Sequence, residues 1–176
     1  EMMGQEWELN DLVREVIKDK SYFEKSQGGV TISGGEPTLY PTFAQKFLKA
    51  LKEKGIQTAL DTCGQSSRKS LDMILPYATL LLYDLKLIDA KKHEQLTGSV
   101  NHRILENLMY IGDFMRSHIH PKTLWIRTPI IPGATDSEEN IRGIGEFLAT
   151  RMGTVVDRWE LCAFNNLCGD KYERLG

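Results

Sequence analysis

The chain has 176 residues, 41% of them apolar and 26% charged, and a formal net charge of −2, which is ordinary for a globular protein. This charge balance provides no basic field for a nucleic acid, and the longest apolar stretch, YATLLLY, is far too short to cross a bilayer. Three widely spaced cysteines argue against a disulfide framework and favour a reducing compartment, so we expect one cytoplasmic domain over residues 1–176.

Segments with helical and strand-like patterns alternate along the chain. Four of them have apolar residues at the spacing of an amphipathic helix, namely residues 8–20, 42–55, 102–115 and 136–152. Five short runs are rich in β-branched and aromatic residues, at 30–33, 56–62, 79–87, 123–131 and 155–164. Repeated strand–helix units predict an α/β fold with a parallel sheet and right-handed crossovers.

Local signals indicate where these elements begin and end. Asn10 is a candidate N-cap of the first helix, Gly55 a natural residue after the second, and Asp136 a candidate N-cap of the last. The charged segment 89–95 is expected to be an exposed connection in which His93 faces water.

A parallel α/β domain usually opens with a strand, whereas this chain opens with a helical pattern. We therefore expect that a first strand is missing and that the chain is a piece of a longer protein.

Charged residues share one face of four predicted strands, mostly toward the carboxyl ends. The period-two alternation of the strands places on this face Asp61, Asp84, Lys86, Arg127, Arg158 and Glu160. One interpretation is an open sheet with one solvated face. The other, which we favour because parallel sheets usually have both faces covered, is a barrel mouth that gathers polar groups around a ligand. Buried charges of this kind would need a ligand, an ion or one another as partners.

The stretch GGVTISGGEPTLY places two glycines, a glutamate and a proline at the carboxyl end of the first predicted strand. Gly34 and Gly35 permit unusual backbone angles and the close approach of a ligand, and Pro37 stiffens the exit from the loop. Exposed carbonyls and the carboxylate of Glu36 would suit an ammonium or another cationic group. A tight connection without a ligand is the alternative, and neither a Walker loop nor the dinucleotide motif G-x-G-x-x-G fits these glycines.

Five segments in order carry a resemblance to a known family: GGVTISGGEP, DTCG, YDLK, WIRTPIIPGATDSEENI and WELCAFNNLCGDKYERLG. Together they resemble the glycyl-radical-enzyme activating enzymes of the radical S-adenosylmethionine superfamily, the group that includes the activator of pyruvate formate-lyase. The resemblance implies a partial parallel (β/α)6 barrel of TIM-like type. It also implies a [4Fe–4S] cluster, S-adenosylmethionine, a 5′-deoxyadenosyl radical, and a glycyl radical installed on a partner enzyme, with flavodoxin or ferredoxin as electron donor.

The resemblance also implies roles for individual residues at the expected rim. Gly34, Gly35 and Glu36 would hold the methionyl amino group of S-adenosylmethionine. Asp61 and Lys86 would contact the methionyl end of the same molecule. Both of these last residues belong to the charged face that the alternation of the strands indicates.

Further positions complete the implied site. Arg127 would lie near the cofactor. Asp61 and Asp84 would coordinate a monovalent cation close by. Asn165 would contribute to the cofactor site from the end of the last strand, at a position where many family members have a histidine.

The chain departs from the family pattern in its cysteines. The cluster ligands of the family follow C-x-x-x-C-x-x-C in the loop after the first strand, and this spacing is absent here. Cys63, Cys162 and Cys168 are interpreted as ordinary reduced cysteines. We therefore expect the cluster only in a longer parent protein, and we expect the 176-residue chain by itself to be inactive.

Two alternatives to an activating enzyme stay open from the sequence. The chain could be a non-catalytic binding domain of barrel fold that has lost its cluster. Whether cysteines are encoded upstream would decide between this domain and an activating enzyme. The chain could instead be a lyase that uses Lys86 as an amine nucleophile, although Asp84 two residues away should keep that amine charged.

Overall fold

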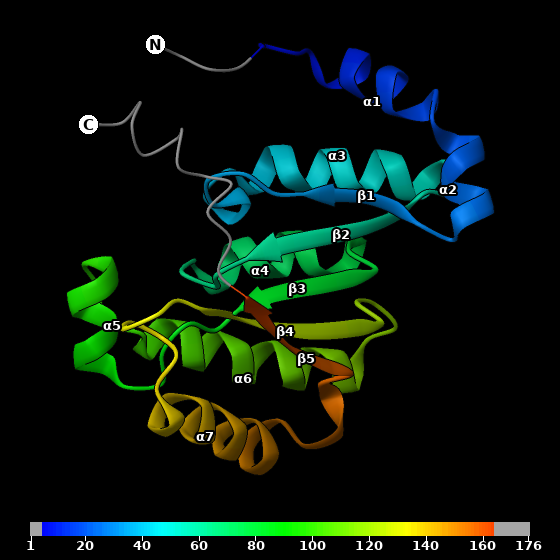
Figure 1. Cartoon of the computed structure of the whole chain (residues 1–176). Coiled ribbons are helices and arrows are strands. Elements are labelled where there is room, and N and C mark those ends of the chain that lie inside the picture. The colour runs from blue at the N-terminus through cyan, green and yellow to red at the C-terminus, as the bar shows by residue number, and fades with distance from the viewer. Residues whose placement is uncertain (1–4, 164–176) are drawn as a thin grey trace.

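The computed structural model describes residues 5–163 of the chain. Five parallel strands form one sheet in the order β1-β2-β3-β4-β5. Their bounds are β1 (Gly29–Ile32), β2 (Gln57–Thr62), β3 (Leu80–Asp84), β4 (Thr123–Ile130) and β5 (Arg158–Ala163). Each strand pairs in parallel with the next one along the chain (Figure 1), which confirms the predicted parallel α/β arrangement.

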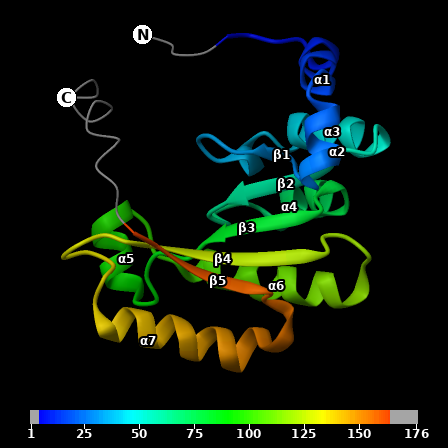
Figure 2. The same cartoon turned by 45° about the vertical axis from the view of Figure 1, so that its right-hand side comes forward.

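Helices connect the strands and cover one side of the sheet. The α-helices are α1 (Leu9–Ile17), α2 (Lys20–Ser26), α3 (Pro41–Glu53), α4 (Arg68–Ile74), α5 (Ala90–Thr97), α6 (His102–Ser117) and α7 (Glu138–Phe147). Shorter turns are η1 (Pro37–Leu39), η2 (Leu75–Tyr77), η3 (Leu148–Met152) and η4 (Gly153–Val155). Figures 1 and 2 show α3, α4, α6 and α7 along one side of the sheet and α5 beyond the carboxyl ends of the strands.

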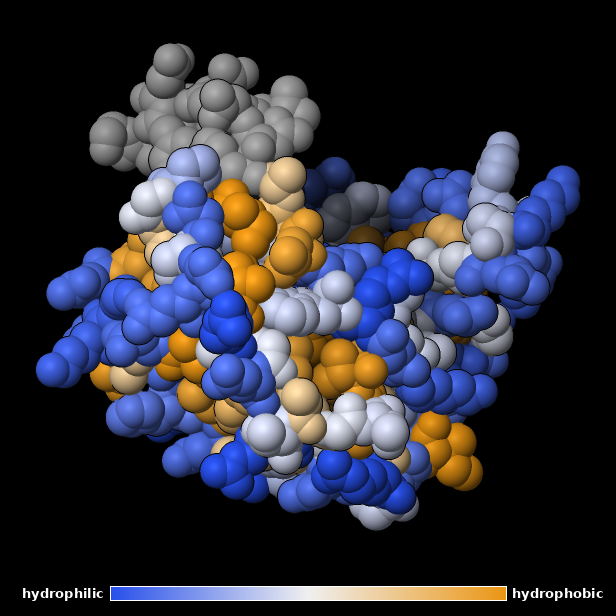
Figure 3. Space-filling model, turned by 60° about the horizontal axis from the view of Figure 1, so that its bottom comes forward, coloured by the Kyte–Doolittle hydropathy of each residue, from blue (hydrophilic) through white to orange (hydrophobic). Residues whose placement is uncertain are grey.

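The outer surface of these helices is mixed in polarity. The face turned forward in Figure 3, on the side of α7, carries hydrophilic side chains with apolar ones between them. Such a surface is expected when amphipathic helices turn their apolar side to the sheet. Within residues 5–163, no helix is both long and apolar enough to cross a membrane.

Several predicted helix boundaries are corrected by the structure. The first predicted helix, residues 8–20, corresponds to α1, which ends at Ile17, and the sequence did not predict α2, which begins at Lys20. At the N-cap position of α1 stands Glu8 rather than Asn10. The N-cap of α7 is Ser137 rather than Asp136, because the Ser137 hydroxyl accepts a hydrogen bond from the amide of Asn140. The predicted end of the second helix is confirmed, since the residue after the C-cap of α3 is a glycine with φ +73°.

The charged side chains of segment 89–95 are exposed, as expected, but the segment forms the start of α5 and not an irregular connection. Asp89 caps this helix by accepting a 2.8 Å hydrogen bond from the amide of Lys92. His93 is only 4% exposed, and its Nδ1 lies 2.7 Å from the carbonyl oxygen of Ser99. The expectation of a solvated histidine is therefore wrong, because this hydrogen bond lets the ring tie the end of α5 to the following turn.

The sheet separates a buried face from a half-exposed one. Along β3 and β4, fully buried residues alternate with partly exposed ones. The buried side chains pack with the helices in one apolar core, to which the strands contribute Leu60, Leu81, Tyr83, Leu124 and Ile126. Burying each large side chain contributes about 1.5–3 kcal/mol, so the stability of the sheet comes mainly from its helix side. The other face is left for the charged residues.

A glycine fixes the loop that follows β2 against this core. Gly64 has φ +73°, and a Cβ built there would lie 1.7 Å from the hydroxyl oxygen of Tyr83. That hydroxyl donates a 2.7 Å hydrogen bond to the carbonyl of Ile104 in α6. The position therefore needs glycine both for its backbone angle and for the space that the tyrosine fills.

We expect Gly64→Ala to lower the free energy of unfolding by about 3 kcal/mol, because the added methyl combines left-handed strain with a clash against Tyr83. Gly55→Ala is the matched control, since Gly55 has the same φ of +73° but its Cβ would meet no described atom within 4 Å. The control should lose only about 1 kcal/mol. Urea unfolding followed by circular dichroism measures both values. Equal losses would show that the contact with Tyr83 imposes no constraint.

Candidate functional site

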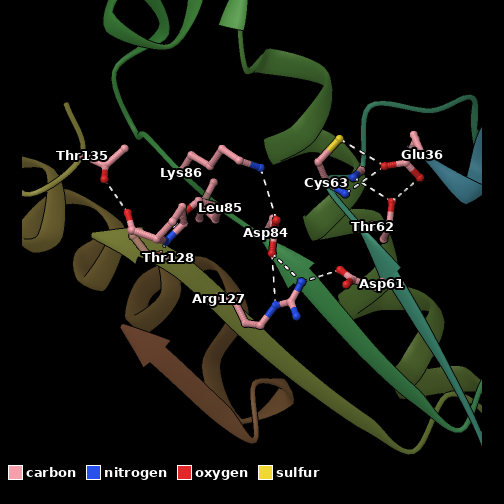
Figure 4. A network of polar contacts seen from close by, with 12 residues as sticks. Glu36, Asp61, Thr62, Cys63, Asp84, Leu85, Lys86, Arg127, Thr128 and Thr135 are labelled. Carbon is pink, nitrogen blue, oxygen red and sulfur yellow. Dashed lines mark hydrogen bonds and ion pairs between the residues drawn. The ribbon is translucent and has the colours of Figure 1, made fainter. Parts of the chain in front are cut away.

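Strand register brings the predicted charged residues to the same end of the sheet. Asp84 pairs with Arg127 across β3 and β4, and Arg127 pairs in turn with Glu160 on β5. Asp61 lies near the end of β2, and its Oδ2 accepts a 3.1 Å hydrogen bond from the hydroxyl of Ser33 at the exit of β1. Polar side chains thus form a continuous layer across the five strands, the centre of which is shown in Figure 4.

Arg127 is the centre of an ion-pair network on this face. Its Nη2 donates to Asp61 and, at 2.8 Å, to Asp84, to which its Nε also donates at 3.1 Å. Lys86 adds a 3.3 Å contact to the other oxygen of Asp84. Burial alone would lower the pKa of Arg127, but the carboxylates of Asp84 and Asp61 outweigh it and raise that pKa. The four side chains are only 20–30% exposed, so they neutralise one another and this face is not simply a solvated surface.

Glu36 stands apart from this network, because its carboxylate is bonded to the two loops beside it. Oε1 accepts hydrogen bonds from the amide and hydroxyl of Thr38, at 3.1 and 2.7 Å, and from the hydroxyl of Thr62 at 2.8 Å. Oε2 accepts from the amide and the thiol of Cys63, at 2.9 and 3.1 Å. Burial alone would raise the pKa of Glu36, but these hydrogen bonds outweigh it and lower that pKa. Burial, and then the neighbouring carboxylate, raise the pKa of the Cys63 thiol.

A cavity of about 230 Å³ opens between these groups. Six of the residues predicted from the sequence line it: Gly34, Gly35, Glu36, Asp61, Asp84 and Lys86. Arg127 reaches the cavity through its bonds to the two aspartates. Asn165 lies outside the described residues. The structure therefore brings together every predicted site residue that it describes.

The cavity suits one end of a zwitterionic ligand. Gly34 has φ +97°, and a Cβ on either of the paired glycines would meet no described atom within 4 Å, so the space above their backbone is open. Carbonyls and carboxylates at this edge match an ammonium, while Lys86 and Arg127 match a carboxylate. The volume is smaller than the roughly 300–1,000 Å³ of a pocket that encloses a whole cofactor. These residues thus fit the methionyl end of S-adenosylmethionine.

Metal ligands are sparse in the described part of the chain. Residues 5–163 contain no group of three or more histidine, cysteine, aspartate or glutamate side chains that could hold a metal ion. Asp61 and Asp84 are bridged by Arg127, so their predicted binding of a monovalent cation stays a prediction. Cys63 follows β2 and Cys162 lies within β5, whereas the third cysteine falls outside the described residues. Residues 5–163 therefore do not fit an iron–sulfur cluster.

Three buried asparagines hold the rim loops in place, and the sequence analysis missed them. Asn107 in α6 donates to two carbonyls of the loop after β2, at 2.8 and 2.9 Å. Asn140 in α7 donates to the carbonyl of Lys86 at 3.0 Å and accepts from the amide of Ile88 at 2.9 Å. Asn101 donates to the carbonyl of Ile88 at 2.9 Å. For Asn107 the sequence does carry a signal, namely an amide on the apolar face of an amphipathic helix.

Comparison with known proteins assigns the family. Residues 3–143 match the family model described as the Radical SAM superfamily. The chain belongs to the radical SAM superfamily. This membership confirms the resemblance noted in the sequence, and it agrees with the charged cavity at the carboxyl ends of the parallel strands.

Radical SAM relatives of this chain are activating enzymes. The (2S)-3-sulfopropanediol dehydratase activating enzyme of Klebsiella oxytoca is 34% identical over 175 residues, which cover 99% of this chain and 53% of that protein. The pyruvate formate-lyase-activating enzyme of Staphylococcus epidermidis is 33% identical over 174 residues, which cover 96% of this chain and 66% of that protein. The chain thus spans about half to two thirds of the length of these relatives.

A solved radical SAM structure supports the fold class. The crystal structure of a domain of a pyruvate-formate lyase-activating enzyme from Bacteroides vulgatus is 33% identical to this chain. The match has a TM-score of 0.67 and covers 76% of this chain and 79% of that one. Together with the five-stranded parallel sheet, this similarity confirms the predicted α/β fold of the partial-barrel radical SAM type.

We expect Arg127→Met to lower the free energy of unfolding by about 2 kcal/mol, because it leaves two partly buried carboxylates without their shared cation. Adding Asp61→Asn to that variant should restore part of the loss, since one of the two unpaired charges is then removed. Urea unfolding at neutral pH measures both changes.

Arg142→Met provides the control for this comparison. Arg142 pairs with Glu138 on the surface, where the two side chains are 68% and 84% exposed, and its loss should cost less than about 0.5 kcal/mol. A double variant less stable than Arg127→Met alone would contradict the proposed role of the guanidinium between the two carboxylates.

Proposed function

We propose that the whole protein activates a glycyl-radical enzyme and that residues 1–176 form the core of its cofactor-binding domain. The observation that carries this proposal is the rim cavity, in which predicted residues from three separate segments meet at the ends of β1, β2 and β3 (Figure 4). The activating enzymes among its relatives support the same class of activity.

S-adenosylmethionine is the proposed ligand of the rim. The backbone carbonyls of residues 34–36 and the carboxylate of Asp61 would form the part that takes the methionyl ammonium. Lys86 and Arg127 would face the methionyl carboxylate. Asp84 holds both of these cations in the structure, so it would set their orientation, and it would also take part in binding a monovalent cation.

In the full-length protein, S-adenosylmethionine and a [4Fe–4S] cluster would supply the 5′-deoxyadenosyl radical that removes a hydrogen atom from a glycine of the partner enzyme. The residues of this chain would hold the methionyl end in one orientation. A flavodoxin or ferredoxin is the proposed electron donor, and a cytoplasmic location is proposed with it. Asn165 is proposed to complete the cofactor site from the end of the chain.

We predict that the coding sequence just upstream supplies one more strand with C-x-x-x-C-x-x-C in its exit loop, a unit of roughly 30 residues. The full-length protein, given a reductant and S-adenosylmethionine, should then release 5′-deoxyadenosine. With a glycyl-radical enzyme encoded nearby, electron paramagnetic resonance should show a glycyl doublet on that partner. Asp61→Ala should suppress both signals by about 100-fold, because the methionyl end would lose its fixed orientation.

Asp113→Ala is the control for this experiment, since Asp113 is an exposed aspartate on α6 that pairs only with Arg116 within the described residues. It should leave both signals unchanged. An upstream region without the three cysteines would defeat the enzymatic proposal and leave the non-catalytic binding domain as the better reading.

The 176-residue chain by itself should take up no iron–sulfur cluster and should bind S-adenosylmethionine weakly or not detectably, because three separated thiols do not form a chelating loop. Anaerobic reconstitution followed by iron and sulfide analysis tests the first expectation, and calorimetry tests the second. Uptake of about four irons per chain would overturn the expectation that the chain by itself takes up no cluster.

A further inference from the structure

We propose that Glu36 is a positioning residue of the rim, which holds the glycine loop against the end of β2, and that its carboxylate does not itself contact the ligand. This inference rests on the proposed function, because it concerns the same S-adenosylmethionine site. It differs from the role that the family resemblance implies for Glu36, which is to hold the methionyl amino group directly.

The first support is that the carboxylate of Glu36 is already saturated with hydrogen bonds. It accepts from five donors, two on Thr38, one on Thr62 and two on Cys63, at 2.7–3.1 Å. A carboxylate offers about four lone-pair positions to donors. A ligand ammonium could bind it only by displacing one of these bonds, at the cost of leaving a partly buried donor unpaired.

The second support is what these bonds connect. Thr62 is the last residue of β2 and Cys63 follows it, whereas Thr38 lies in η1 just beyond the glycine pair. Thr62 and Cys63 lie 26 and 27 positions after Glu36 in the chain, so Glu36 joins two separate segments that both line the cavity. Its carboxylate sets the distance between the glycine carbonyls and the carboxylate of Asp61.

The glycine pair is held through its two ends, where Ser33 bonds to Asp61 on one side and Glu36 bonds to Thr62 on the other. A Cβ on either Gly34 or Gly35 would meet no described atom within 4 Å, and Gly34 is in the left-handed region at φ +97°. A loop of this kind has many accessible conformations unless its ends are fixed. The bonds of Glu36 fix one end, next to the residues proposed to take the ammonium.

The other side of the anchor is itself rigid. The hydroxyl of Thr62 accepts a 2.9 Å hydrogen bond from the amide of Gly64, and the carbonyl of Gly64 accepts one of 2.8 Å from Asn107 in α6. Asn107 is 2% exposed and Gly64 lies against Tyr83. A continuous hydrogen-bonded path therefore runs from the apolar core through Thr62 to Glu36 and the glycine loop.

The first experiment tests the anchor without any ligand, in the 176-residue chain. Thr62→Val keeps the size of the side chain and removes both the donor to Glu36 and the acceptor for the amide of Gly64, which are consecutive bonds of the same path. We expect it to increase the alkylation rate of Cys63 by iodoacetamide at least about threefold, because the loop would open more often and uncover the thiol. Peptide mass spectrometry distinguishes Cys63 from the other two cysteines.

Two variants control this measurement. Thr58 lies on the same strand and is as buried as Thr62, but its hydroxyl donates to the carbonyl of Tyr77, far from the rim. Thr58→Val should therefore leave the alkylation rate of Cys63 unchanged. Thr62→Ser keeps the hydroxyl and should restore the wild-type rate. An unchanged rate in Thr62→Val would overturn the inference that these bonds hold the loop closed.

The second experiment measures the affinity of the cluster-loaded full-length protein for S-adenosylmethionine by calorimetry. Glu36→Gln and Thr62→Val should each weaken binding by about tenfold, and the double variant should be no weaker than either one, because both break the same anchor. If Glu36→Gln weakens binding while Thr62→Val does not, or if their effects add, then the carboxylate contacts the ligand and the inference is wrong. It is also wrong if neither variant changes the affinity.

Asp61→Asn separates this inference from the proposed function. If Asp61→Asn leaves the affinity unchanged, the rim is not the cofactor site and the proposed function fails there, whatever the alkylation rates show. If Asp61→Asn weakens binding and Thr62→Val does not, the site stands and only the positioning role of Glu36 is refuted.

Discussion

The guanidinium of Arg127 lies between the carboxylates of Asp61 and Asp84 and so joins the ends of three adjacent strands. These side chains stand on the face of the sheet opposite the apolar core, where an unpaired charge would be costly because each is less than a third exposed. Mutual pairing lets a parallel sheet concentrate charge at one end without losing stability. Lys86 extends the same network to the edge of the cavity.

The helix side of the sheet supplies the rigidity that this arrangement needs. Tyr83 and Asn107 connect the loop after β2 to α6, and Asn140 connects the loop after β3 to α7. Functional side chains at the rim are therefore held by buried groups that no ligand would touch. The ligand-binding side chains thus lie on one face of the sheet, and the packed helices on the other face hold them in position. A cofactor can be oriented precisely only when its binding residues are held rigidly in this way.

The sequence predicted the fold class and the rim because both follow from simple periodicities. The alternation of strands placed Asp61, Asp84 and Arg127 on one face, and parallel pairing then brought them together. It could not predict α5 or the burial of His93, because a short charged helix becomes stable only through capping and tertiary hydrogen bonds. Nor could it show that Glu36 is bonded to Thr62 and Cys63, since those partners depend on the packing of two distant loops.

Hydrogen–deuterium exchange of the cluster-loaded full-length protein, with and without S-adenosylmethionine, is the most direct test of the rim as the cofactor site. We expect the ligand to slow exchange in peptides that span residues 33–38, 61–66 and 84–88, because these three segments line the cavity or support it. Peptides from the amino ends of β2, β3 and β4 should be unaffected. Slower exchange confined to other segments, such as the loop before α7, with the three rim peptides unchanged, would contradict the assignment.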